Sequence, residues 1–101
     1  MFPSLSKTYP FIMSAIQGKL TPQELSPKTV GIYFVFSGGS TVWIGQGEIQ
    51  KGLINAFKDV TISTENPDSF SFVECEPDSL AKEYERWLSA LKPKINNPRR
   101  Q

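Results

Sequence analysis

The stretch GIYFVF at residues 31–36 gives the clearest strand signal in the chain. After its opening glycine it holds only aromatic and β-branched residues, and it is apolar on both faces, which is typical of a central strand. SGGS at residues 37–40 predicts a tight turn, because glycine takes positive φ at little cost. TVWIG at residues 41–45 then reads as the returning strand. Residues 31–45 are therefore predicted to form a β-hairpin.

A helix and a third strand are predicted to follow the hairpin. Helical spacing of apolar residues runs from residue 48 to about residue 59, at Ile49, Leu53, Ala56 and Phe57. Residues 63–69 are polar and contain Asn-Pro-Asp, which indicates a loop. FSFVEC at residues 70–75 has the composition of a strand.

The last helix is predicted to begin after Asp78, a favourable N-cap residue, and to end at Pro93. Its apolar stripe consists of Leu80, Tyr84, Trp87, Leu88 and Leu91. Residues 94–98 are expected to run on in an extended conformation.

The beginning of the chain is interpreted as an extension, residues 1–26, placed before a domain at residues 27–101. Apolar residues in the stretch 11–20 have nearly helical spacing, and Pro10 would fit the first turn of such a helix. The predicted fold is therefore α/β, of the α+β kind. It has a small three-stranded antiparallel sheet flanked by helices, with an added N-terminal helix.

Composition limits the possible chemistry. The chain has 101 residues, enough for one domain, and its 39% apolar and 21% charged content argues against disorder. It has no histidine and one cysteine, Cys75, which excludes an internal disulfide and every histidine-based triad or zinc site. No apolar run approaches the roughly 18 residues of a membrane span, and the N-terminus does not resemble a signal peptide. We therefore expect a cytoplasmic protein.

Two short motifs carry a family resemblance. GIY at residues 31–33 opens one strand of the hairpin, and WIG at residues 43–45 lies on the other, with Trp43 ten residues after Tyr33. Near the end, residues 92–96 read KPKIN, a basic-Pro-x-hydrophobic-Asn segment after a helix. Over residues 27–97 this order resembles the GIY-YIG nuclease family. The resemblance implies a GIY-YIG-like fold and phosphodiester hydrolysis assisted by one divalent metal, Mg²⁺ or Mn²⁺.

The resemblance assigns the family's functional residues to positions of this chain that match its motifs. Tyr33 matches the first tyrosine, and its hydroxyl would activate water or hold a phosphate oxygen; the alternative is a core tyrosine. Trp43 stands where the second tyrosine belongs, and an indole N–H donates but cannot accept a proton. Trp43 is then a packing residue or a stacking face for an unpaired base. Gly45 and Gln46 form the exit from the strand, with Gln46 a candidate nucleic-acid contact.

The first helix departs from the family pattern. The resemblance places an arginine at or next to Gly52, where this chain has Lys51 beside a glycine. Lys51 would supply a point charge without the planar fork that holds a phosphate through two bonds. The alternative is an ordinary surface lysine.

The last helix leaves two candidates for the family's metal-binding glutamate. If the family's spacing is counted back from Pro93 of the C-terminal motif, Tyr84 falls at the glutamate position. If it is counted forward from Ala81, which matches a small residue of the family one turn earlier, Glu85 falls there. We prefer Glu85 as the acid and metal ligand, with a surface glutamate as the alternative. Asn96 matches the family's supporting asparagine.

Basic residues gather near the C-terminal end, at Lys92, Lys94, Arg99 and Arg100. They would bind backbone phosphates of DNA or RNA, or else form a solvated tail. Three functions follow as hypotheses. The first is a nucleic-acid-associated nuclease-like domain with reduced or lost cleavage. The second is an active metal-dependent endonuclease using Tyr33, Lys51, Glu85 and Asn96, and the third is a protein-interaction module.

Overall fold

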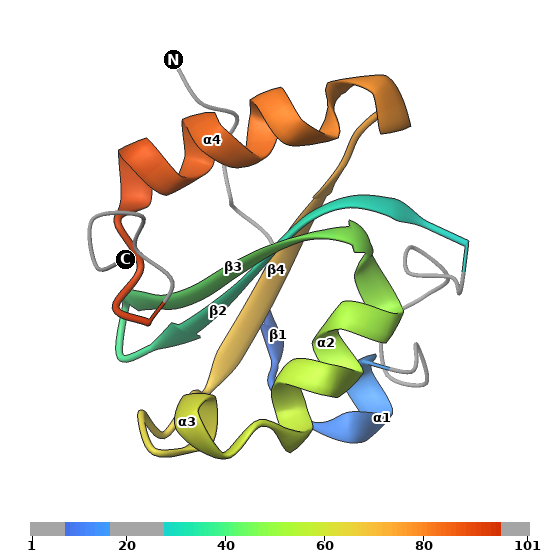
Figure 1. Cartoon of the computed structure of the whole chain (residues 1–101). Helices are drawn as coiled ribbons and strands as arrows, with labels where there is room; N and C mark the ends of the chain where they lie inside the picture. The colour runs from blue at the N-terminus through green and yellow to red at the C-terminus, as the bar shows by residue number, and fades with distance from the viewer. Residues whose placement is uncertain (1–7, 17–27, 96–101) are drawn as a thin grey trace.

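The computed structural model describes residues 8–16 and 28–95 and shows an antiparallel sheet between two helical layers (Figure 1). The strands are β1 (Tyr9–Pro10), β2 (Val30–Ser37), β3 (Ser40–Glu48) and β4 (Ser69–Glu74). The helices are α1 (Met13–Ile16), α2 (Ile49–Lys58), α3 (Val60–Ser63) and α4 (Leu80–Leu91), with a 3-10 turn at Pro77–Ser79. The strand order is β1-β4-β2-β3. The fold is therefore α+β, as expected from the sequence.

The hairpin and the third strand are confirmed. β2 and β3 pair antiparallel around Gly38 and Gly39, whose φ values of 56° and 86° suit a tight hairpin turn. The register shifts by one residue after Val35, because Val42 is an extra residue in β3. β4 pairs antiparallel with the other side of β2, which makes β2 a central strand.

Successive side chains of β2 point to opposite faces of the sheet and so belong to two separate hydrophobic cores. Ile32 and Phe34 face α4 and pack with Trp87 and Leu88, which are buried as predicted. Tyr33 and Val35 face the opposite layer, where buried residues of α1, α2 and α3 meet the sheet: Ala15, Ile16, Ile49, Leu53, Ala56 and Ile62. Figure 1 shows α4 alone on one side and the other three helices on the other.

The expected three-stranded sheet is wrong, because β1 adds a fourth strand. Tyr9 pairs with Phe70 and Pro10 with Ser69, so Pro10 lies in an edge strand and not in a helix. Proline is compatible with this edge position, where it has no ladder hydrogen bond to donate. Of the helix expected at residues 11–20, the described part forms only the single turn α1, and residues 17–20 lie outside the described residues. Residues 9–16, placed in the predicted extension, thus pack into the same core as the rest of the domain.

Three local predictions also need correction. Asp78 is inside the 3-10 turn, and the N-cap of α4 is Ser79, without a side-chain capping bond. Phe57, expected on the apolar stripe of α2, is 38% exposed and meets Phe11 edge-on. The short helix α3 was not predicted; Asp59 caps it by accepting from the backbone N–H of Ile62 at 3.0 Å. The helix α4 ends as predicted before Pro93, with Lys92 in the left-handed region at φ 48°.

No helix in residues 8–16 and 28–95 combines the length and the apolar character needed to cross a membrane.

Candidate nucleic-acid site

A small hollow lies between β3, α2 and α3, with the Tyr33 side chain in its wall. Its volume is about 90 Å³, and the described residues that line it are Tyr33, Trp43, Gly52, Asn55, Ala56, Asp59 and Ile62. Three positions that the family resemblance singles out, those of Tyr33, Trp43 and Gly52, therefore share one hollow. The tyrosine itself is only 8% exposed.

Two glycines make room for the tyrosine ring. Gly45 is the β3 partner of Tyr33, and a Cβ built there would overlap the ring and hydroxyl. A Cβ built on Gly52 of α2 would overlap the same ring. The ring of Tyr33 thus fills the space that side chains at both positions would need. Gly45, interpreted from sequence as part of the exit from the strand, lies inside β3 and is needed for packing space.

The environment of the Tyr33 hydroxyl opposes ionisation. Burial raises the pKa of this hydroxyl above its ordinary value, a hydrogen bond with the Trp43 side chain lowers it, and the charge on Tyr84 raises it. Burial is the largest of these effects, so the pKa is raised overall. Because tryptophan only donates, its indole N–H must be the donor and the tyrosine oxygen the acceptor. Tyr33 therefore stays protonated at neutral pH and is a poor proton acceptor.

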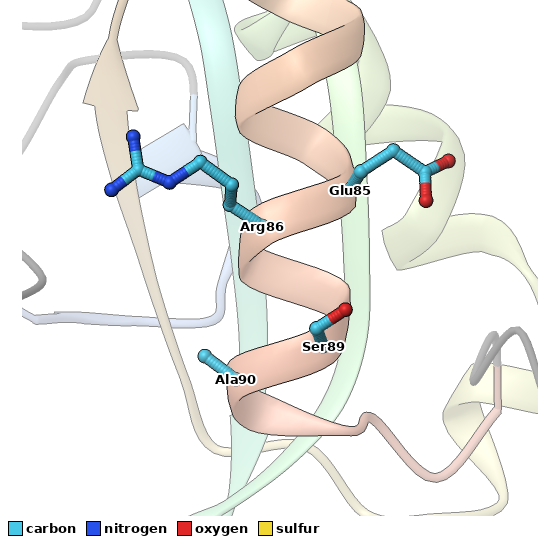
Figure 2. A pocket seen from close by; sticks show the side chains of 4 residues that line it. All are labelled: Glu85, Arg86, Ser89 and Ala90. Carbon is cyan, nitrogen blue, oxygen red and sulfur yellow. The ribbon is translucent and has the colours of Figure 1, made fainter.

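The two candidates on α4 differ in their surroundings. Tyr84 is half-buried and packs against the α4-side core. Glu85 is exposed and lies with Arg86, Ser89 and Ala90 along a shallow surface hollow of about 440 Å³. Figure 2 shows Glu85 and Arg86 leaving α4 in different directions. Glu85 does not line the hollow that contains Tyr33.

Lys51 and Gln46 are both exposed, and neither lines the hollow. Lys51 precedes Gly52 on α2, and adjacent helical residues project about 100° apart. The structure thus brings together Tyr33 and Trp43, whereas Lys51 and Glu85 lie outside their hollow.

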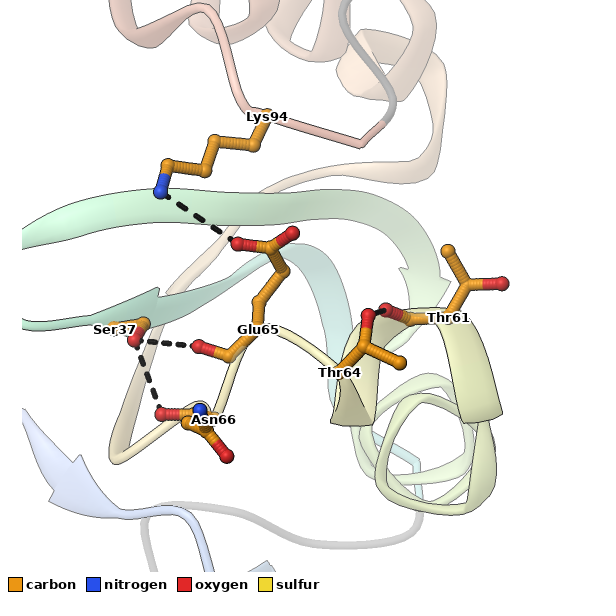
Figure 3. Close-up of polar contacts among 6 residues, drawn as sticks. All are labelled: Ser37, Thr61, Thr64, Glu65, Asn66 and Lys94. Atoms are coloured by element: carbon orange, nitrogen blue, oxygen red, sulfur yellow. Dashed lines mark hydrogen bonds and ion pairs between the residues drawn. The ribbon is translucent and has the colours of Figure 1, made fainter.

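The basic residues near the C-terminus are described as far as residue 95, so Asn96, Arg99 and Arg100 lie outside the described residues. Lys92 and Lys94 line a hollow of about 420 Å³ between the end of α4 and the β2–β3 turn. The backbone N–H of Lys94 donates to Thr41 O at 3.1 Å, and its Nζ lies 3.6 Å from Glu65 Oε1. Figure 3 shows this ion pair beside Ser37, whose hydroxyl donates to the backbone oxygens of Glu65 and Asn66.

The residues at the hollow do not fit a metal centre. In the described part of the chain, His, Cys, Asp and Glu form no group of three or more that could hold a metal ion. Asp59 is the one carboxylate among the lining residues, and its Oδ1 already accepts the N–H of Ile62. Mg²⁺ usually takes one or two carboxylates together with phosphate oxygens and water. Glu85, the expected ligand, stands elsewhere on the surface.

No protein-family model, curated protein or solved structure matches this chain. The site must therefore be understood from its own geometry.

Two polar residues of the hollow, Asn55 and Asp59, were missed by sequence reasoning. The signal was available, because residues 52, 55, 56 and 59 share one face of a helix by spacing. The arrangement offers an aromatic ring, an amide, a carboxylate and a buried hydroxyl. None of the described lining residues carries a positive charge.

Proposed function

We propose that the chain is a nucleic-acid-binding domain of the GIY-YIG kind in which phosphodiester cleavage is reduced or lost. The observation that supports this most is the meeting of three family positions in one hollow, where Tyr33, Trp43 and Gly52 occupy the places of two tyrosines and an arginine. The antiparallel neighbours β4, β2 and β3 are the three strands that the resemblance leads us to expect, and β1 is an addition to them.

The chemistry of the hollow explains why turnover should be low. Hydrolysis of a phosphodiester needs a proton acceptor for water and a positive group at the developing negative charge. Tyr33 holds its proton because burial raises its pKa, and Trp43 cannot accept one. Gly52 offers no cation. Loss of one such stabilising donor costs about 10²–10³ in rate, so losing two groups leaves little activity.

The test combines cleavage with binding. Purified protein is incubated with supercoiled plasmid or structured RNA and Mg²⁺ or Mn²⁺, and binding is followed by fluorescence anisotropy at several salt concentrations. We expect no nicking, together with an affinity that falls as salt rises, because lysine contacts to phosphate release counterions. Lys92→Ala should lower the affinity and reduce the salt slope by about one contact. Lys28→Ala, at an exposed lysine that lines neither the Tyr33 hollow nor the one with Lys92, is the charge-matched control.

Strong metal-dependent cutting that Tyr33→Phe or Glu85→Gln abolishes would contradict the proposal and establish the active endonuclease instead. In that case Glu85 would hold the metal together with substrate phosphate.

An exposed apolar surface favours the protein-interaction module as the second candidate. Ile12 is 43% exposed and Val60 78%, and Phe57 lines a neighbouring hollow of about 370 Å³ with Phe11. Of the three exposed side chains, Phe57 lines this hollow, and an exposed apolar side chain beside a hollow is a feature of binding surfaces. Absence of both cutting and salt-sensitive binding would leave this function as the better account. A Val60→Lys variant that loses a partner captured by the wild-type chain would then support it.

A further inference from the structure

We propose that the hollow at Tyr33 takes one unpaired nucleobase, stacked on Trp43 and hydrogen-bonded by Asn55 and Asp59. This inference rests on the proposed function and specifies its ligand as single-stranded nucleic acid, either DNA or RNA. It arises from the residues that line the hollow, all of which belong to β2, β3, α2, α3 or the junction at Asp59.

Trp43 supplies the stacking surface. It is half-buried, it lines the hollow, and it packs against the core cluster that contains Tyr33. Packing against this core restricts the motion of the indole ring. An aromatic ring fixed before binding loses little conformational entropy when a base stacks on it. Stacking of this kind accepts every base, because each has a π face.

Charge decides between a base and a phosphate as the occupant. Among the described lining residues the ionisable side chains are Tyr33 and the acidic Asp59, and none is basic. A phosphate would be repelled there, whereas a neutral base would not. The sugar-phosphate backbone then stays outside the hollow.

The polar groups add a preference among bases. Asn55 is exposed on α2, and its amide offers a donor and an acceptor, the pair that adenine requires. Asp59 uses Oδ1 for the Ile62 N–H, so Oδ2 is the oxygen available to accept an exocyclic amino group. Adenine and cytosine carry such an amino group, and thymine and uracil do not. We expect the hollow to favour adenine and cytosine over thymine and uracil.

Size requires the base to be unpaired. The volume of about 90 Å³ is well below the roughly 300–1,000 Å³ of ordinary small-molecule sites. Such a space receives the polar edge of one base while the face of its ring lies against Trp43, and it does not receive a nucleotide or a base pair. In a duplex the face of each base is already stacked, so a duplex would have to open before Trp43 could be covered.

The experiment uses the fluorescence of the two tryptophans. Trp87 is only 2% exposed and cannot touch a ligand, so it gives a constant background, and Trp87→Phe removes that background if the variant folds. Short single-stranded oligo(dA), oligo(dC), oligo(dT) and their RNA equivalents are titrated against a duplex of equal length. We expect quenching of Trp43 by the single strands, strongest for adenine and cytosine, and little quenching by the duplex.

Variants separate the contacts. Trp43→Leu should weaken single-strand binding by about tenfold, because it keeps an apolar side chain but removes the stacking face. Asn55→Ala should weaken oligo(dA) binding several-fold and leave oligo(dT) nearly unchanged. Ser89→Ala, an exposed polar residue on α4 that does not line the hollow, is the matched control and should change neither.

The outcomes of these titrations distinguish failure of the base site from failure of the proposed nucleic-acid-binding function. Salt-sensitive binding that is equal for single strand and duplex, with Trp43 emission unchanged, would overturn the base site while leaving nucleic-acid binding intact. Absence of any binding at low salt would overturn both.

Discussion

The ring of Tyr33 occupies the space directly beside Gly52, so that a side chain at residue 52 would overlap the ring and its hydroxyl. Glycine inside a helix ordinarily costs about 0.5–1 kcal/mol relative to alanine. In α2 this cost is offset by close packing between the helix and the central strand. The position where the resemblance expects an arginine is thus filled from the opposite side by the tyrosine.

Gly52→Ala should destabilise the domain by about 1–3 kcal/mol, because overpacking outweighs the gain in helix propensity. Urea denaturation measures the change in the free energy of unfolding. In a Tyr33→Ala background the same substitution should become neutral or stabilising, since the overlapping ring is gone. Gly52→Arg, which would restore the family's residue, should displace Tyr33 and be more destabilising still. Equal effects of Gly52→Ala in both backgrounds would contradict this account.

The sequence was sufficient to predict the hairpin, the strand β4 and both long helices, because each has a clear period and clear turn residues. β1 could not be predicted in this way. β1 is only two residues long, Tyr9 and Pro10, so it cannot show the alternation of apolar and polar residues that marks a strand. Its extended conformation depends on pairing with Phe70 and Ser69, far away in the sequence. The helix α3 is likewise too short to show a period, although Asp59 as its cap was a local signal.

The candidate site was predictable only in part. Motif spacing located Tyr33, Trp43 and Gly52, but it could not show that the tyrosine ring packs over two glycines. That relationship depends on how α2 crosses the sheet. The family's glutamate position on α4 was also undecided between Tyr84 and Glu85, because counting back from Pro93 and counting forward from Ala81 give different residues. Three-dimensional packing half-buries Tyr84 and exposes Glu85.

Trp87→Ala should cost about 3–5 kcal/mol of folding free energy. Trp87 is almost fully buried and packs edge-on against Phe34, with ring centroids 4.8 Å apart. Removing the indole leaves a cavity between α4 and the sheet that the surrounding strands cannot close. Chemical denaturation followed by far-UV circular dichroism gives the midpoint. Ser89→Ala on the exposed side of α4 is the control, and its midpoint should stay within about 0.5 kcal/mol of wild type. Unchanged stability of the tryptophan variant would mean that α4 does not pack on this face.

Tyr33 should make stability depend on alkaline pH. Burial raises its pKa in the folded protein above the unfolded value, so the folded state binds the proton more tightly. Its contribution is fully present below the unfolded pKa and is lost as pH rises through the folded pKa. Urea midpoints measured from neutral to alkaline pH should therefore fall more steeply for wild type than for Tyr33→Phe. Parallel curves for the two proteins would show that the hydroxyl is exposed to solvent.

Glu65→Gln should strengthen nucleic-acid binding, if the proposed function holds. Backbone hydrogen bonds from Lys94 and Ile95 to Thr41 and Val42 fix this segment on β3, so Lys94 keeps its place when its ion-pair partner loses its charge. The ammonium group then has one competitor fewer for a phosphate oxygen.

Stability should change by less than about 1 kcal/mol, because the pair is largely exposed, with 56% of the Lys94 side chain and 35% of the Glu65 side chain accessible. Anisotropy titrations over a range of salt should show higher affinity and a steeper salt slope than wild type, and Lys94→Ala should show the opposite. Glu76→Gln removes the same charge at an exposed site away from Lys94 and serves as the control. An equal gain in Glu65→Gln and Glu76→Gln would show that net charge alone matters. A gain confined to Glu65→Gln would place Lys94 against the bound phosphate backbone, because Glu65 forms its ion pair with Lys94.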